Sequence, residues 1–535
     1  MHRLSGIWLF LPLVLALWAC AGKERVPELP GAQLRNVSLQ PETIVLSAGQ
    51  AVELPFTVQD ASYAFSLDVS SPDCPVRLIG SGGAVPAEVV LQSLAKGTEE
   101  GRYIATLADA GTGTIYDLSL RLAIFTGADS FVASPYFSVK AYAPEPWQRT
   151  GLPVVYVDTE GGQGINSKEV FVPASLHIDG TTEYEGFSTA VSCSIRGRGN
   201  TTWTWPKKPY LLKLDSKKSI FGLPKHKRWV LLANFMDRTL MRNLVSMHVA
   251  QLTSLSWTPH CVPVELVLNG KHQGSYLLIE QVRVDNDRVD ITEMSAKDND
   301  GEALTGGYLL ELDFHYDNEF QWKERNIPFA VKSPDPDEIT AQQKAYIKSY
   351  VKEVSDAIYG ADFKDPEKGY ARYLDVDSFI DYWIVYEVMC NHELGNPGSV
   401  YFHKDRGGLL TAGPCWDFDW GVLSFYTSAG ETSLVNGHAI WYDRLFQDPA
   451  FKTRLKARFQ ELLPQLETIP GYMDECEALL DASAKLNFAM WNPADDKSQN
   501  GGRIINGDEN LTFHDAIQRL KSNYLHHLDV IQRKL

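Results

Sequence analysis

Residues 413–421 read GPCWDFDWG and place two aspartates, Asp417 and Asp419, on either side of one phenylalanine. A second acidic segment lies upstream at residues 391–396, which read NHELGN and include Glu393. The sequence between them predicts a strand at 399–403, a turn and a second strand, so a hairpin joins the two segments. The carboxylates can therefore face one cleft.

Carboxylates in this arrangement suit phosphoryl transfer, in which one orients or deprotonates the acceptor and another holds the metal ion that bridges the phosphates. The pair His392-Glu393 does not form a zinc-protease motif, because position 396 is Asn where the second histidine would stand. The alternative interpretation is that Asp417 and Asp419 are satisfied turn residues beside a tryptophan-rich core.

A basic segment precedes both acidic ones. Residues 196–228 hold many cations and one acid, Asp215. The cations are Arg196, Arg198, Lys207, Lys208, Lys213, Lys217, Lys218, Lys225, Lys227 and Arg228. Gly197 and Gly199 alternate with the arginines in a loop whose backbone N–H groups could approach phosphate oxygens, and Lys213 projects from a predicted strand at 210–214. The alternative is a solvated basic face, since Gly-x-Gly without a third glycine is a weak signal.

These segments together resemble the CotH family of spore-coat-H-like atypical kinases, which are frequent in exported lipoproteins. The resemblance covers about residues 150–460. Its motifs are RGRGNTTW at 196–203, PKKPY at 206–210 with Lys213, WVLLAN at 229–234 with Asp237 and Arg242-Asn243, and WDFD at 416–419. The resemblance implies a divergent protein-kinase-like fold, ATP with Mg²⁺ or Mn²⁺, and phosphorylation of Ser or Thr on a protein.

The resemblance also implies roles for the basic residues. Arg196, Arg198 and Lys208 would bind the nucleotide, Lys213 would be the phosphate-pairing lysine, and Glu280 would orient Lys213.

On the acidic side, the resemblance makes Glu393 the catalytic acid, in a position where the family usually has aspartate. Asn396 would assist the metal, and Asp417 with Asp419 would bind it. The extra methylene of Glu393 could keep, slow or redirect the reaction, because positioning dominates phosphoryl transfer.

The overall charge limits the partners. The chain has 535 residues, with 50 Lys and Arg against 67 Asp and Glu, and a formal charge of −17. This balance argues against nucleic acid as a partner, although it does not exclude one basic pocket. A 44% hydrophobic composition with 22% charged residues indicates a packed globular protein of two or three domains.

The N-terminus predicts export. Residues 1–19 read as a signal peptide, and LWAC at 17–20 resembles a bacterial lipobox with Cys20 as the lipidated residue. Cleavage at another site is the alternative, because Trp18 is bulkier than usual at its position. No later apolar run is long enough for a membrane helix, so we expect a cell-envelope protein attached to the outer membrane only through its lipid, on the periplasmic or surface side.

We predict a multidomain fold: a tether at 20–35, an all-β immunoglobulin-like sandwich of about seven strands at 36–143, and an α+β kinase-like domain at 150–535 whose part from 460 onward is helical. Alternating runs at 61–69 and 116–124 predict strands of the sandwich. In the second domain, helices are expected at about 338–358, 375–390, 440–465 and 510–533, with a further helix capped by Asp237. Asn269-Gly270 predicts a two-residue hairpin turn.

Apart from Cys20, the six cysteines are scattered without a CxxC pair and are expected to be buried free thiols, although the sequence cannot exclude pairing. They are Cys74, Cys193, Cys261, Cys390, Cys415 and Cys476.

Two other functions remain open from the sequence. The chain could be a surface binding or adhesion protein with a degenerate active site. It could also be a glycoside hydrolase that uses Glu393 with Asp417 or Asp419, since two carboxylates at suitable separation suffice. A kinase needs Arg198 and Lys213 near those acids, whereas a glycosidase does not. The protein acceptor or envelope partner is not identified by the sequence.

Overall fold

The computed structural model describes residues 147–315, 320–424, 432–495 and 506–535, and gives strands between residues 28 and 142 by their backbone alone. The predicted signal peptide, Cys20, Cys74 and the predicted strand at 61–69 lie outside the described residues. The chain divides into two compact units. Each is described by itself.

The first unit consists of two β-sheets. One has the strand order β1-β9-β8-β10, with β5 also paired to β8, and the other has the order β2-β4-β7-β6; β3 falls in the second unit. The alternating run at 116–124 falls within β8, which confirms that strand, whereas β1 falls within the expected tether. The strand bounds are Glu28–Gln33 (β1), Val37–Leu39 (β2), Thr43–Val45 (β3), Val52–Val58 (β4), Val76–Gly80 (β5), Val89–Lys96 (β6), Arg102–Asp109 (β7), Ile115–Gly127 (β8), Ser130–Ala133 (β9) and Phe137–Tyr142 (β10).

The second unit, which includes residues 142–535, begins with a closed barrel of order β11-β12-β13-β14-β15-β17-β16. Most neighbours are antiparallel, and the barrel closes through the parallel pair β11 and β16. The strands are Val154–Thr159 (β11), Val172–Asp179 (β12), Phe187–Gly197 (β13), Tyr210–Lys218 (β14), His226–Leu232 (β15), Cys261–Leu268 (β16) and Lys271–Glu280 (β17).

Both faces of this barrel contribute to buried clusters, because successive side chains of a strand point to opposite faces. Leu212, Trp229 and Leu278 belong to one buried cluster formed by the barrel strands themselves. Their neighbours Leu211 and Val230 belong to the main core, which continues into the helices. Part of the barrel surface is therefore fixed against the rest of the unit.

The hairpin between β16 and β17 turns at Asn269-Gly270, whose φ angles are 50° and 75°. Two positive φ values are what the predicted turn requires, and asparagine and glycine tolerate them best. This prediction is confirmed.

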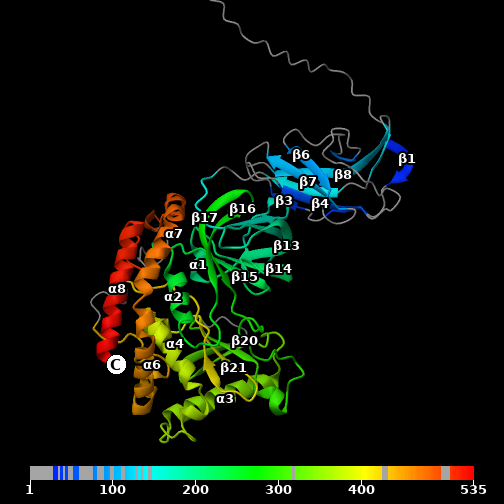
Figure 1. Ribbon diagram of the computed structural model, residues 1–535. Helices are drawn as coiled ribbons and strands as arrows, with labels where there is room; N and C mark the ends of the chain where they lie inside the picture. Colours follow the sequence, from blue (N-terminus) through cyan, green and yellow to red (C-terminus); the bar gives the residue numbers. More distant parts are fainter. Residues whose placement is uncertain are drawn as a thin grey trace, which may run out of the picture. The chain divides into compact units, whose positions relative to one another are not determined.

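The second half of the unit combines a five-stranded sheet with helices (Figure 1). The sheet order is β19-β20-β18-β21-β22. Its strands are Tyr308–Leu312 (β18), Gln321–Glu324 (β19), Ile327–Ser333 (β20), Val400–Lys404 (β21) and Leu410–Ala412 (β22). The α-helices are Thr201–Thr204 (α1), Arg242–Gln251 (α2), Ala341–Tyr359 (α3), Val376–Val388 (α4), Tyr442–Leu445 (α5), Pro449–Leu466 (α6), Ile469–Met490 (α7) and Phe513–Lys534 (α8). The described chain is thus multidomain and of mixed α+β class.

Helices α3, α4 and α8 confirm three of the predicted helices. The single helix expected at 440–465 is wrong, because α5 ends before Asp448, whose side chain accepts the N–H of Ala450 and starts α6 with Pro449 at its first turn. Helix α7 was not predicted as a separate element. The helix expected after Asp237 is α2; Met241 occupies its N-cap position, and the carboxylate of Asp237 accepts the N–H of its first residue, Arg242.

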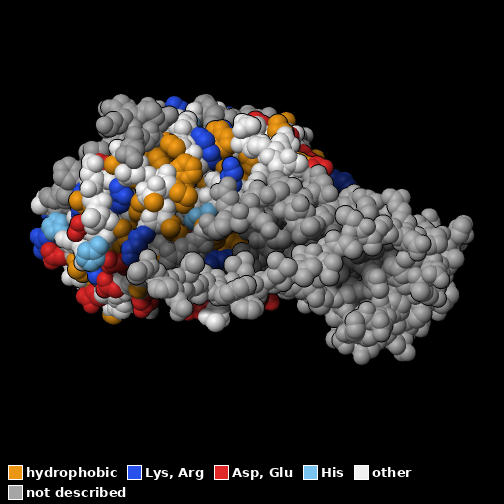
Figure 2. All heavy atoms as spheres, turned by 90° about the horizontal axis from the view of Figure 1, so that it is seen from above, with side chains coloured by type: hydrophobic (Ala, Val, Ile, Leu, Met, Phe, Trp, Pro, Cys, Tyr) orange, Lys and Arg blue, Asp and Glu red, His pale blue; other side chains and the backbone are white. Residues whose placement is uncertain are grey.

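Among the described residues, no helix combines the length and the apolar character needed to cross a membrane. Four of the five cysteines in that part of the chain are buried, as expected, and Cys261 is partly buried. The face shown in Figure 2 mixes Lys and Arg with hydrophobic and acidic side chains. The net negative charge is therefore not uniform over the described surface.

Candidate functional site

A cleft of about 840 Å³ opens between the barrel and the second half of the same unit. The barrel side contributes arginines, and the opposite side contributes carboxylates. Six of the residues expected from the sequence line it: Arg196, Arg198, Glu393, Asn396, Asp417 and Asp419. Lys208, Lys213 and Glu280 are not among its lining residues.

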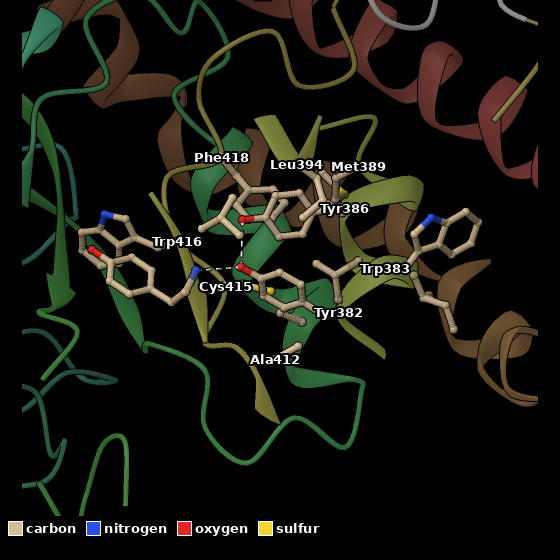
Figure 3. Close-up of a cluster of buried hydrophobic side chains, with 14 of the residues drawn as sticks. Tyr382, Trp383, Tyr386, Met389, Leu394, Ala412, Cys415, Trp416 and Phe418 are labelled. Atoms are coloured by element: carbon tan, nitrogen blue, oxygen red, sulfur yellow. Dashed lines mark hydrogen bonds between the residues drawn. The ribbon is translucent and has the colours of Figure 1, made fainter. Parts of the chain in front are cut away.

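Hydrophobic packing brings the two acidic segments together. Leu394 follows Glu393 and is fully buried, and so is Phe418, which separates Asp417 from Asp419. Both belong to the cluster of Figure 3, where the ring of Phe418 lies 4.7 Å from that of Tyr386 on α4. The apolar residue in each segment anchors it, so the neighbouring carboxylates remain at the cleft.

The pKa values of the three carboxyl groups at the cleft are all raised. Burial raises the pKa of Glu393 well above its usual value, and the charges of Asp417, Asp419 and Asp313 raise it further. Burial likewise raises the pKa of Asp419, with Asp417 and Asp237 adding to the effect. The pKa of Asp417 is raised by burial, and the nearby Arg198 opposes that rise. Clustered acids of this kind favour binding of a cation or a proton.

Asp417 has a φ of 64°, a conformation uncommon outside glycine. The loop that carries it is held by side chains from distant parts of the chain. Asn243 accepts the N–H of Phe418 at 2.7 Å, and Asn506 both accepts the N–H of Gly421 and donates to the carbonyl of Asp419. These anchors fix the direction in which the two aspartates point.

A buried ion cluster lies behind the same loop. Arg242 bonds Asp237 and also Asp508 at 2.7 Å, while its Nε donates to the carbonyl of Val422 at 2.8 Å. Each of the three charged residues is at most 2% exposed. Asp237 also accepts the backbone N–H of Arg242, the first residue of α2, so its carboxylate supports the start of that helix as well as the ion cluster.

The arginine loop is built around glycines. A Cβ on Gly197 would lie 2.3 Å from the ring of Trp203, so only glycine lets this ring pack there. The backbone N–H of Arg198 bonds the carbonyl of Pro209, and its guanidinium lies over Trp416, 5.6 Å from the ring centre. Arg198 is thereby held beside the residue that precedes Asp417.

Lys213 lies on the face of the barrel that also carries Arg196, but it is exposed and does not line the cleft. It is the cross-strand neighbour of Arg228. The ring of Phe171 lies 5.1 to 5.8 Å from the charged groups of Arg196, Lys213 and Arg228. Phe171 was not singled out in the sequence, since a lone phenylalanine carries no signal there.

The expected pairing of Lys213 with Glu280 is wrong. Leu212 pairs with Trp229, and Trp229 pairs with Glu280, so Glu280 lies on the face of the sheet opposite to that of Lys213. The fully buried carboxylate of Glu280 instead lies 2.9 Å from Nδ1 of His260 and 3.8 Å from Nε of Arg288.

The two lysines of PKKPY have separate surroundings. Lys208 donates to the carbonyl of Trp203 at 2.8 Å and lies over its ring, so it braces the arginine loop. Lys207 is 1% exposed and donates to the carbonyls of Ala233 and Ser275 and to Oδ1 of Asn487 on α7. Neither contact is with a cleft carboxylate.

The carboxylates of the cleft suit a divalent metal ion that is bound jointly by the protein and by a substrate phosphate. Oε2 of Glu393 is buried and has no hydrogen-bond partner among the described residues. No three His, Cys, Asp or Glu side chains in that part of the chain meet closely enough to hold an ion by themselves. Mg²⁺ is usually held by one or two carboxylates together with substrate phosphates and water, so the residues present suit such a site.

Residues that the sequence did not single out complete the cleft. Asp313 contributes to the raised pKa of Glu393, and Glu311 accepts a hydrogen bond from Tyr401 and pairs with Lys332 at 2.9 Å. Glu311 lies within the buried strand β18 and Asp313 follows it, so an acid inside or just after this apolar run was the available signal in the sequence.

The comparisons with known proteins bear on the same part of the chain. The family described as CotH kinase protein matches residues 195–524, which is well over half of the sequence. The match includes both the arginine loop and the acidic segments of the cleft. Among curated proteins, no relative matches the chain.

Proposed function

The chain belongs to the CotH kinase protein family, and from that premise we propose that it is an atypical protein kinase that transfers the γ-phosphoryl group of ATP to Ser or Thr of a protein. A divergent protein-kinase-like fold, an immunoglobulin-like first unit and lipid attachment through Cys20 at the bacterial cell envelope are parts of the same proposal. The acceptor is a protein, and nucleic acid is not a partner.

One observation supports this function above the others: the cleft carries arginines on one side and carboxylates on the other. A nucleotide triphosphate with its metal ion needs both charges, since the phosphates require cations and the metal requires oxygen ligands. The volume of about 840 Å³ is within the range of small-molecule sites. A glycosidase has no need of the arginine side, so we do not favour that alternative.

The residues have separate roles in this mechanism. Arg198 and Arg196 bind phosphate oxygens, and their fixed planar guanidinium groups suit this task. Asp417 and Asp419, with Asn396, would hold Mg²⁺ or Mn²⁺, which would neutralise charge on the phosphates. Lys213 and Lys208 remain outside the cleft, where Lys208 braces the loop.

Glu393 orients the acceptor hydroxyl and takes its proton. Burial and the neighbouring acids raise the pKa of Glu393, and a cation held by Asp417 and Asp419 would lower it again, so that the carboxylate is ionised and able to accept the proton. The proton moves from the hydroxyl to the Glu393 carboxylate as the hydroxyl oxygen bonds to phosphorus, and ADP leaves with the former bond electrons.

The test is a thermal-unfolding titration of the purified protein with ATP, Mg²⁺ and both together. We expect a rise in Tm only when both are present, and no rise for Asp417→Asn, because binding to the native state alone stabilises it. Arg149→Gln, which changes an ion pair with Asp179 outside the cleft lining, is the matched control and should respond like the unchanged protein.

A protein that responds to no nucleotide in the presence of Mg²⁺ or Mn²⁺ would contradict the kinase proposal. That outcome would favour the binding or adhesion protein. A response that survives Asp417→Asn would leave nucleotide binding intact but contradict the metal site.

A further inference from the structure

A buried chain of hydrogen bonds connects the C-terminal helix α8 with the turn that carries Glu393. It starts at His527, which is fully buried, as is its partner Glu387 on α4. Nε2 of His527 donates to Oε1 of Glu387 at 2.9 Å. The other ring nitrogen, Nδ1, is buried and has no hydrogen-bond partner among the described residues. The ring is therefore held through one nitrogen.

Glu387 also bonds the backbone of residues 435–436. Its two carboxylate oxygens accept the backbone N–H groups of Val435 and Asn436, each at 2.8 Å. A buried carboxylate with three donors is well compensated, and losing one of them would leave it short of a partner. The backbone of Asn436 is thus held in place by its hydrogen bond to the Glu387 carboxylate.

Asn436 then reaches the segment at the cleft. Its Nδ2 donates to the backbone carbonyl of Asn391 at 3.0 Å, and the side chain of Asn391 accepts the backbone N–H of Glu393 at 2.9 Å. Asn391 is fully buried and is held at both its backbone and its side chain. The chain of bonds therefore ends on Glu393 itself.

The turn that carries Glu393 needs such support. It is a 3₁₀-helix of three residues, His392–Leu394, and so short a helix has little stability of its own. Its Glu393 carboxylate must nevertheless lie within a few tenths of an ångström of its place, because phosphoryl transfer depends on alignment.

From these contacts we propose that His527 is a positioning residue that acts through Glu387, Asn436 and Asn391 to hold Glu393 for proton transfer. The effect of His527 on the rate of phosphoryl transfer rests on the proposed kinase function. The effect of His527 on the position of Glu393 holds independently of that function. His527 does not touch the ligands, so nucleotide binding is expected to be insensitive to it.

The experiment compares three changes in the full-length protein. His527→Leu removes the donor, whereas His527→Gln keeps an N–H close to the position of Nε2. Asn436→Ser removes the amide donor but leaves the backbone bond to Glu387. His526→Leu, at an exposed histidine next in sequence, is the matched control.

With Mg-ATP and dephosphorylated casein as acceptor, we expect His527→Leu and Asn436→Ser to lower kcat about 10- to 100-fold with KM for ATP unchanged. His527→Gln should remain within about threefold, and His526→Leu should match the unchanged protein. The proposal would be overturned if folded His527→Leu had the same kcat as the unchanged protein. It would also be overturned if the loss of activity came from a higher KM for ATP and not from a lower kcat. If His527→Leu does not fold, Asn436→Ser decides by the same criteria.

A second measurement separates this proposal from the kinase function. Amide hydrogen exchange at Glu393, read without nucleotide, should be faster in His527→Leu and Asn436→Ser than in His527→Gln or His526→Leu. If the unchanged protein transfers no phosphoryl group, the kinase proposal fails, and the exchange rate of Glu393 alone decides the positioning role. Unchanged exchange in both variants would contradict it.

Discussion

Two clusters of buried acids meet the loop at 417–422, and they differ in how their charge is compensated. Asp237 and Asp508 share Arg242, and this contact raises the pKa of the arginine despite its burial. Glu393, Asp417 and Asp419 have no ion pair with a cation among the described residues, and burial raises the pKa of all three.

The difference separates a structural cluster from one that requires a ligand. A buried carboxylate that bonds an arginine directly is complete within the fold. A group of carboxylates that relies on a more distant Arg198 is incomplete, and a divalent ion or protons can supply the missing charge. In the sequence alone the two clusters look alike, since each is made of acidic residues from segments that are far apart in the chain.

The largest effect should follow from breaking the compensated cluster. Arg242→Met leaves Asp237 and Asp508 buried without their cation, and we expect the free energy of unfolding to fall by about 3–5 kcal/mol. Urea denaturation at pH 7 measures it. Arg533→Met, which changes an exposed ion pair with Asp529 on α8, is the control and should cost less than about 1 kcal/mol. Equal losses would show that Arg242 is not part of a buried cluster.

The uncompensated cluster should make stability depend on pH in the absence of metal. An acid whose pKa is raised in the native state binds a proton there that the unfolded chain has released, so stability falls as pH rises above the usual value of 3.8 for aspartate toward the raised value. Each group contributes about 1.4 kcal/mol per pH unit within that window. Asp419→Asn removes one contribution.

Urea denaturation in EDTA, from pH 4.5 to pH 8, tests this dependence. The stability of Asp419→Asn should exceed that of the unchanged protein by an amount that grows with pH. Mg²⁺ with ATP should reduce this difference. Parallel curves for the two proteins would contradict the raised pKa of Asp419.

A smaller effect should follow from separating the two acidic segments. Gly421 has a φ of 70°, and a Cβ there would lie 2.6 Å from the ring of His392, next to Glu393. Gly421→Ala should therefore cost about 1–2 kcal/mol and weaken the nucleotide-dependent rise in Tm. Gly222→Ala, at a similar φ of 76° but with open space around it, isolates the backbone cost. Equal losses in the two variants would show that the contact with His392 has no role.

The sequence was sufficient for elements defined by local chemistry. The hairpin at Asn269-Gly270 was predicted because two residues determine that turn, and helix α3 because its apolar spacing is regular. The closure of the barrel was not predictable, since it depends on the parallel pairing of β11 with β16, more than a hundred residues apart.

For the site, the acids and arginines were found because motifs of charged residues are visible in the sequence. The role given to Glu280 failed for a geometric reason. Sequence shows that Lys213 and Glu280 each end or interrupt an apolar strand, but only the register of three strands reveals that they lie on opposite faces. The chain of hydrogen bonds from His527 to Glu393 was also invisible in the sequence, because it passes through three residues, Glu387, Asn436 and Asn391, that the fold brings together with His527.

The enclosure of Lys207 between the barrel and α7 has a consequence for chemical labelling. Burial lowers the pKa of its amine to about 7, so a large share of this amine is unprotonated and nucleophilic at neutral pH. Yet it is 1% exposed and bonds Asn487, so an acylating reagent can reach it only after the barrel and α7 separate. The rate of acylation of Lys207, read against that of exposed Lys213, therefore reports how often this junction opens.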